Sequence, residues 1–310
     1  MKTIFTSKIL FIASFLWLTG CSTDDTALEP QAENKLEINI DQSEYISINE
    51  EVYGNENCEK LYVNANYYDQ NEINFTIYFT ISKDGNLLRV RYDERPQSGS
   101  GITKNFLTPN FNPLSTFNIS NFHYDSTTGE VKFNFSGKVF YDNDNEIARN
   151  ISGKYRVNTL INTECSVPNT GLYYDSEDLK LVSYSIDITK HINHTQTHKF
   201  FSNNGFAIYL HVAQDLWFYP LGEITINENN STDSVAFKQA IGPIIADQVQ
   251  NINDQEWKDY ETSGKIIIEN KYIEKNKKMI SGKLNLLIKD NGQEVYSLNG
   301  IEFKTLSLEE

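Results

Sequence analysis

The residues best suited to metal chemistry lie in one short segment, His191-Ile-Asn-His194-Thr-Gln-Thr-His198. On a helix, His191 and His194 would share a face, which is how zinc ligands are often presented. On a strand they have opposite parity and point to opposite faces of the sheet. No glutamate completes a His-Glu-x-x-His pattern, and no cysteine is near. A metal site formed by His191, His194 and His198 and a solvated loop both stay open, and the Asn, Thr and Gln neighbours favour the loop.

A second candidate site is acidic. Asp142, Asp144 and Glu146 offer closely spaced oxygens within Asp-Asn-Asp-Asn-Glu, as a calcium loop does. The segment lacks the glycine and the distal glutamate of the EF-hand pattern, and it falls between two expected strands, where Asx residues form turns. Calcium binding and a simple turn are therefore the two interpretations.

Aromatic rings form a third group of candidates. Trp217, Tyr219 and Trp257 offer flat rings that can stack on the apolar face of a sugar. Large rings also dominate buried area in protein cores, so core packing is the alternative. We expect Trp217 and Trp257 to be the informative positions for a test of ligand binding.

Motifs for catalysis are absent from the sequence. It contains no nucleophile elbow, zincin helix, phosphate loop or carboxylate pair in a recognisable setting. The 27 Lys and Arg residues face 42 Asp and Glu residues, giving a formal net charge of −15. An acidic chain without a basic stripe is a poor partner for nucleic acid. We expect no nucleic-acid partner and no cofactor, and we lean toward a protein that is not an enzyme.

The first residues have the features of an export signal. Lys2 and Lys8 precede the apolar run from Ile9 to Leu18, which is too short to span a bilayer, and Thr19-Gly20-Cys21 follows. Leu18-Thr-Gly-Cys21 resembles the lipobox of bacterial lipoproteins, and this resemblance implies that a lipid is attached to Cys21. Two or more acyl chains make a stable membrane anchor.

The residues after the lipobox give a further indication of where the protein is located. Ser22-Thr-Asp-Asp25 is similar to the acidic signal that directs lipoproteins of the Bacteroidota to the cell surface, although a solvated linker explains the same acids. Ile151-Ser-Gly-Lys154 and Leu298-Asn-Gly-Ile-Glu-Phe303, at the ends of the expected domains, resemble the domain ends of small uncharacterised lipoproteins of Flavobacterium-type bacteria. The Asn, Ile, Lys and Tyr richness of the whole chain fits a source in the Bacteroidota. The resemblance implies a lipid-anchored outer-membrane protein, on the periplasmic side or at the cell surface, and implies no activity.

Cys58 and Cys165 are the only cysteines after Cys21. In an exported protein such a pair predicts a disulfide, with two buried free thiols as the alternative.

Alternating apolar and polar residues predict an all-β fold. Three hairpins are expected, around Lys83-Asp-Gly-Asn86, Asp125-Ser-Thr-Thr-Gly129 and Asp142-Asn-Asp-Asn145. In the second half, strands are expected at 181–189, 205–213, 222–227, 264–269, 279–289 and 295–306. The apolar residues of the segment 234–249 recur with a period nearer to that of a helix, and Gly242-Pro243 interrupts the pattern. The segment therefore predicts a short helix or two turns.

The chain divides into a signal peptide (1–20), a flexible tether (21–36) and two consecutive sandwich-like or meander β domains (37–166 and 167–310). Short motifs recur in the same order in both halves, which indicates a duplication. Ser136-Gly-Lys matches Ser281-Gly-Lys, and Phe75-Thr-Ile-Tyr-Phe matches Phe206-Ala-Ile-Tyr-Leu.

The function expected from these features is that of a membrane-anchored binding module for a glycan or another envelope protein. A glycan-directed hydrolase of undescribed type and a structural component of an envelope complex are the alternatives. The lipid anchor at Cys21 makes the membrane a partner in each case.

Overall fold

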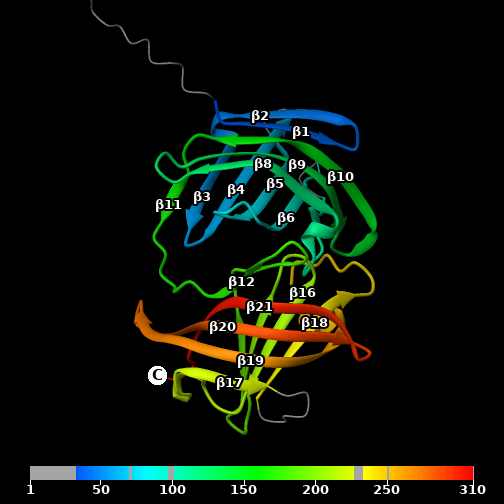
Figure 1. The fold of residues 1–310 in the computed structure, drawn as a ribbon. Helices are drawn as coiled ribbons and strands as arrows, with labels where there is room; N and C mark the ends of the chain where they lie inside the picture. Colours follow the sequence, from blue (N-terminus) through cyan, green and yellow to red (C-terminus); the bar gives the residue numbers. More distant parts are fainter. Residues whose placement is uncertain (1–32, 70–71, 97–100, 227–232, 250, 310) are drawn as a thin grey trace, which may run out of the picture. The chain divides into compact units, whose positions relative to one another are not determined.

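Strands make up almost all of the regular structure in a computed structural model, which describes residues 33–69, 72–96, 101–226, 233–249 and 251–309 (Figure 1). Helical geometry in these residues is limited to single 3-10 turns of three residues, at Asn49–Glu51, Pro113–Ser115, Leu216–Phe218 and Ile252–Asp254. The predicted all-β fold is confirmed. The signal peptide, Cys21 and the tether up to residue 32 lie outside the described residues. No helix in the described part of the chain has the length and apolar character needed to cross a membrane.

The first sheet is built from residues 35–163. Its eleven strands are β1 (Lys35–Ile40), β2 (Ser43–Ile48), β3 (Val52–Asn57), β4 (Lys60–Asp69), β5 (Glu72–Ser82), β6 (Leu87–Glu94), β7 (Lys104–Leu107), β8 (Phe117–Asp125), β9 (Glu130–Tyr141), β10 (Asp144–Val157) and β11 (Ile161–Thr163). The strand β1 begins at Lys35, so the last two residues of the predicted tether belong to it.

The core of this sheet follows from the period of two along its strands. In β4, Leu61, Val63 and Ala65 are fully buried, whereas Tyr62 and Asn64 alternate with them on the opposite face. Phe79 of β5 lies at the centre of the core and packs against the rings of four other aromatic residues, Phe117, Phe133, Phe135 and Tyr155.

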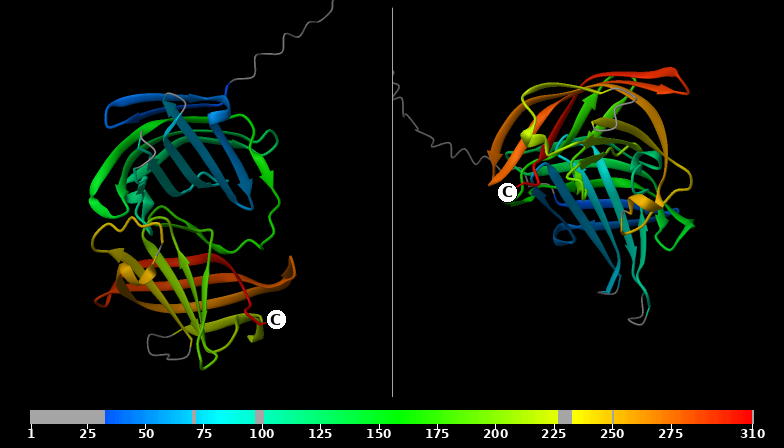
Figure 2. Two further views of the ribbon diagram at one scale, coloured as in Figure 1. Left: turned by 180° about the vertical axis from the view of Figure 1, so that it is seen from behind. Right: turned by 90° about the horizontal axis from the view of Figure 1, so that it is seen from below.

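The second sheet is built from residues 171–306. Its ten strands are β12 (Gly171–Asp175), β13 (Lys180–Ser183), β14 (Asp187–Lys190), β15 (Gln196–Phe201), β16 (Phe206–Val212), β17 (Gly222–Ile226), β18 (Ser234–Ile241), β19 (Glu256–Glu274), β20 (Lys277–Asp290) and β21 (Gln293–Leu306). It curls around its own buried cluster, which includes Phe200, Phe237, Ile266 and Phe303. Figure 2 shows the curvature of both sheets from two further directions.

The two sheets repeat one strand order. The first runs β2-β1-β10-β9-β7-β6-β5-β4-β3, with the short β11 added beside β3, and the second runs β13-β12-β21-β20-β19-β18-β16-β15-β14. In each sheet the first strand in sequence pairs with the last long strand, β1 with β10 and β12 with β21. The recurring motifs lie on equivalent elements, since Phe75–Phe79 belongs to β5 and Phe206–Leu210 to β16. The strand order and the motif order therefore agree with a duplication.

The three predicted hairpins all form. The turn between β5 and β6 uses Gly85 at a φ of 84°, a backbone conformation that side chains disfavour. The second and third hairpins share one continuous strand, β9, which pairs with β8 on one side and β10 on the other (Figure 1).

Two expectations for the second half are wrong. Residues 234–241 form the strand β18, not a helix, because Val235 and Phe237 alternate into the core while Gly242, at a φ of 90°, and Pro243 follow the end of the strand. The strand expected at 181–189 is divided into β13 and β14.

Candidate functional site

The three candidate histidines do not converge. His191 precedes the turn between β14 and β15, and its ring Nε2 lies 3.0 Å from Thr197 Oγ1. His194 is exposed in that turn at a φ of 67°. His198 is fully buried in β15, with its Nδ1 2.7 Å from Thr305 Oγ1. Among the residues that the structure describes, no three His, Cys, Asp or Glu side chains are placed to hold a metal ion.

His198 belongs to a buried polar cluster centred on Asp215. The Asp215 carboxylate accepts hydrogen bonds from Gln196 Nε2 (3.0 Å), Ser307 Oγ (2.9 Å) and the Trp217 backbone N–H (2.8 Å). Burial alone would raise the pKa of Asp215, but these hydrogen bonds hold it below its ordinary value. Burial lowers the pKa of His198 to about 4, so the ring is neutral at pH 7.

This burial predicts a loss of stability in mild acid. The unfolded chain binds a proton at His198 near pH 6.5, whereas the folded chain does so only near pH 4. Stability from this group is therefore fully present above pH 6.5 and is lost as the pH falls toward 4. It accounts for about 2 kcal/mol of the free energy of unfolding between pH 7 and pH 5.

Urea unfolding of a His198→Gln variant at pH 7 and pH 5 measures this term, with the exposed His194→Gln as the matched control. The wild type and His194→Gln should lose more stability than His198→Gln over this interval. Equal losses in all three proteins would contradict the assignment.

The acidic residues at the third hairpin also have separate partners. Asp142 Oδ2 accepts from Asn105 Nδ2 (3.3 Å) and Gln248 Nε2 (3.0 Å). Asp144 Oδ1 accepts from the backbone N–H of Glu146 (3.0 Å), which is an Asx turn. The segment therefore has the hydrogen bonds of a turn. Through Asn105, Asp142 is also connected to Arg91, which is described below.

The candidate aromatic residues lie in different surroundings. Tyr219 is 9% exposed and packs in the second core, so its ring offers no free face to a ligand. Trp217 is half-buried beside the ammonium groups of Lys271 and Lys278. Trp257 packs against Phe111 and Phe201, with ring centroids 5.3 and 5.9 Å away. The three rings form no common platform.

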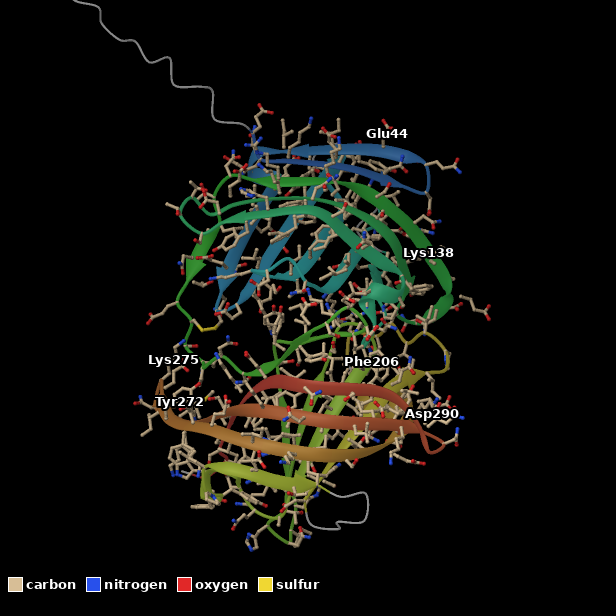
Figure 3. All side chains as sticks on the ribbon, viewed as in Figure 1. Glu44, Lys138, Phe206, Tyr272, Lys275 and Asp290 are labelled. Carbon is tan, nitrogen blue, oxygen red and sulfur yellow. A yellow bond between two sulfur atoms is a disulfide. The ribbon has the colours of Figure 1, made fainter. Side chains whose placement is uncertain are left out.

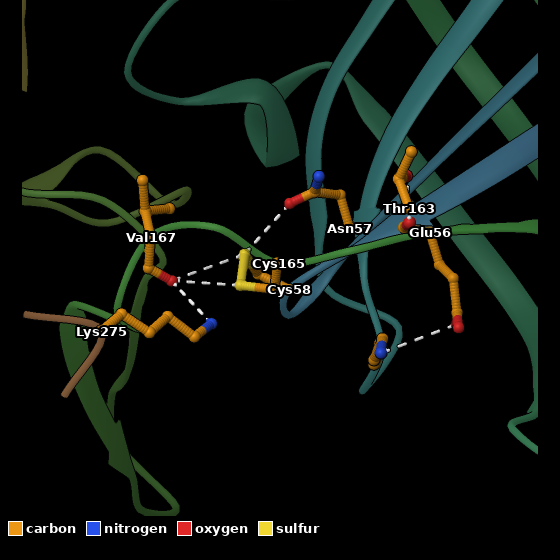
Figure 4. The surroundings of a disulfide bond; sticks show 8 residues. Glu56, Asn57, Cys58, Thr163, Cys165, Val167 and Lys275 are labelled. Atoms are coloured by element: carbon orange, nitrogen blue, oxygen red, sulfur yellow. Dashed lines mark hydrogen bonds and ion pairs between the residues drawn. A yellow bond between two sulfur atoms is a disulfide. The ribbon is translucent and has the colours of Figure 1, made fainter.

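The predicted disulfide is present. Cys58, in the turn between β3 and β4, is bonded to Cys165, which follows β11 (Figure 4). Thr163 Oγ1 donates to the backbone carbonyl of Glu56 (2.6 Å), so β11 is hydrogen-bonded to β3 beside the bridge.

A more promising site lies on the outer face of β4, β5 and β6. Two rows of side chains cross these strands in register, one formed by Tyr62, Thr80 and Arg89 and the other by Asn64, Tyr78 and Arg91. They line a hollow of about 290 Å³, which also touches Leu107 and Gln248, and which we call the Tyr–Arg hollow. All six side chains are half-buried. Figure 3 draws the side chains of both sheets as sticks on the ribbon.

The arginine Arg91 is held within the first sheet. Its Nε donates to Asp93 (2.7 Å) and its Nη2 donates to Asn105 Oδ1 (3.2 Å), and Asn105 donates in turn to Asp142. The hydrogen bond to Asp93 raises the pKa of Arg91. Its guanidinium lies 5.6 Å from the ring centroid of Tyr78, within the range of a cation–π contact. The charge of Arg91 is thus compensated and its position is fixed.

The arginine Arg89 is held differently. Its Nη2 donates to two backbone carbonyls, those of Asp247 (2.6 Å) and Gln248 (3.4 Å). Burial, and then repulsion from Arg91, lower the pKa of Arg89, and the charge of Asp247 opposes this shift. No carboxylate among the described residues lies within ion-pair distance of Arg89. Its orientation is fixed, but its charge is not directly paired.

A second hollow, also of about 290 Å³, lies over β12, β20 and β21. Two of its charged residues, Lys283 and Glu269, form an ion pair at 2.9 Å. In the Tyr–Arg hollow, the described partners of Arg89 are uncharged backbone carbonyls, and this hollow is therefore the stronger candidate for a polar or charged ligand.

Among the described residues, those that line the Tyr–Arg hollow include no carboxylic acid, histidine or cysteine. Phenol, amide, hydroxyl and guanidinium groups suit recognition of a polar ligand better than proton transfer near pH 7. Sequence reasoning missed this site. The available signal was the alternation in β4, β5 and β6, which places Tyr, Asn and Arg on the face opposite the core.

The counterpart of Tyr78 in the second half supports the repeat. Tyr209 occupies the equivalent position on β16 and is likewise flanked by cations, Lys199 at 5.9 Å and Lys238 at 5.2 Å from its ring centroid.

Comparisons of the chain with protein-family models, curated proteins and solved structures found no match.

Proposed function

We propose that this protein is a lipid-anchored binding protein of the bacterial cell envelope and that it holds a glycan in the Tyr–Arg hollow without transforming it. The observation that carries the proposal is the register that brings two tyrosine rings, an amide, a hydroxyl and two guanidinium groups to one half-buried surface. Binding pockets combine apolar and aromatic surface with a few fixed polar groups in this way.

The chemistry of a sugar fits this lining. The C–H face of a pyranose ring can pack on the rings of Tyr62 and Tyr78. Its hydroxyl groups can exchange hydrogen bonds with Asn64, Thr80 and the arginines. Because Arg91 is held by Asp93 and Asn105, part of this surface is organised before a ligand arrives.

Two features support the proposed location. The Leu18-Thr-Gly-Cys21 sequence is typical of a lipidated outer-membrane protein, and Ser22-Thr-Asp-Asp25 favours the cell surface. The disulfide between Cys58 and Cys165 is typical of proteins that fold outside the cytoplasm.

The test is a Tyr78→Ala variant screened on an array of neutral and acidic microbial and plant glycans, followed by calorimetry with each glycan that binds. We expect the wild type to bind at least one glycan and the variant to bind it at least about fivefold more weakly, because a ring contact is worth about 1 kcal/mol or more. Tyr53→Ala is the matched control, since Tyr53 is an exposed tyrosine on β3, 41% exposed, and lines neither hollow. A wild type that binds no glycan, or equal binding by Tyr78→Ala, would contradict the proposal.

A further inference from the structure

The unpaired charge of Arg89 indicates which glycans the Tyr–Arg hollow selects. The guanidinium group has five N–H donors in a fixed plane. Only Nη2 has partners among the described residues, and both partners are uncharged carbonyls. The donors on Nε and Nη1 therefore remain for a ligand.

The surroundings distinguish Arg89 from the other half-buried arginines that the structure describes. The described side chains pair Arg91 with Asp93, Arg149 with Glu94 and Arg156 with Glu130, at 2.7, 2.5 and 3.0 Å. Arg89 is more deeply buried than a surface cation and receives no such partner. The protein has a formal net charge of −15, but no acid is paired with this half-buried cation. The rest of the chain therefore stabilises the charged guanidinium only weakly, and an added anion would stabilise it strongly.

We propose, resting on the proposed glycan-binding function, that the ligand is a uronic-acid saccharide whose carboxylate binds Arg89 while its ring packs on Tyr62 and Tyr78. The three groups share one surface, because Tyr62 and Arg89 both flank Thr80 in register and Tyr78 lies in the next row. A carboxylate accepts charge-assisted hydrogen bonds from a guanidinium, and these are roughly twice as strong as neutral ones. The acidic surface outside the hollow disfavours anions in general, so the selectivity comes from this local contact.

The experiment compares tetrasaccharides of galacturonate, glucuronate, mannuronate and guluronate with their methyl esters by calorimetry on the intact mature protein. The methyl ester keeps the rings and removes the charge. We expect the wild type to bind at least one acid form about tenfold or more tightly than its ester, and to lose affinity as salt is raised.

Variants assign the preference to the residue. Arg89→Gln should bind the acid and the ester equally, Arg89→Lys should keep part of the preference because it keeps the charge, and Arg156→Gln should behave as the wild type. Thermal unfolding of each variant checks the fold, and if Arg89→Gln does not fold, Arg89→Lys and the salt titration of the wild type still decide.

The outcomes separate the two proposals. Equal binding of acid and ester, or binding of neutral glycans alone, overturns the uronate assignment and leaves the glycan-binding function standing. Binding of no glycan at all overturns both. A preference for the acid that persists in Arg89→Gln also overturns the assignment.

Discussion

Replacing both Cys58 and Cys165 with serine is expected to lower the free energy of unfolding by about 4 to 5 kcal/mol. The bridge joins residues 107 positions apart, so its loss frees a long loop in the unfolded chain. The native contacts should change little, because β11 keeps its hydrogen bonds to β3 through Thr163 and Glu56. Guanidinium unfolding of the double variant measures the difference.

The matched control for this measurement is the wild type unfolded in a reductant. Its midpoint should fall to that of the double variant, and reductant should not change the midpoint of the variant itself. If the double variant and the oxidised wild type unfold at the same denaturant concentration, the bridge does not stabilise the protein.

A Cys21→Ser variant is expected to leave the membrane fraction entirely. The proposed anchor carries at least two acyl chains, each buried CH₂ contributes about 0.8 kcal/mol, and a single chain gives only marginal binding. With the chains removed, the acidic body has no attraction to an anionic membrane surface. Fractionation of cells, together with metabolic labelling by a palmitate analogue, gives the result.

The Cys58→Ser/Cys165→Ser variant serves as the matched control here, because it lacks two cysteines and keeps the proposed lipid site. It should sediment with membranes and carry the label. Label on the Cys21→Ser protein, or unlabelled wild type free in the medium, would contradict the proposed lipid anchor at Cys21.

The hairpins were predictable because their signals are local. The Asp84-Gly85 turn and the alternation in Asn74–Ile81 specify β5 and β6 without reference to the rest of the chain. The structure of the segment 234–249 was not predictable from local signals. Its apparent helical period arises because the inward residues of β18 and the apolar residues of the following loop were counted together. Periodicity counts residues and cannot tell where a strand ends and a loop begins.

The candidate site was largely beyond prediction for a related reason. Alternation shows that Tyr62, Tyr78 and Arg89 leave the core face of their strands. It does not show that β4, β5 and β6 lie side by side in a register that aligns them. The histidine segment misled in the opposite direction. His194 and His198 are close in sequence, but His198 is buried in the sheet and His194 is exposed to solvent.

In each half of the chain the first strand pairs with the last long strand, since Lys35 lies opposite Arg156 and Gly171 lies opposite Lys304, and only the short β11 follows in the first half. A unit whose entry and exit are neighbours can be copied, joined end to end or deleted by a genetic event without cutting through its hydrogen-bonded ladder. Such a unit is suited to serve as an evolutionary building block, with one copy free to change its surface while the other keeps its own.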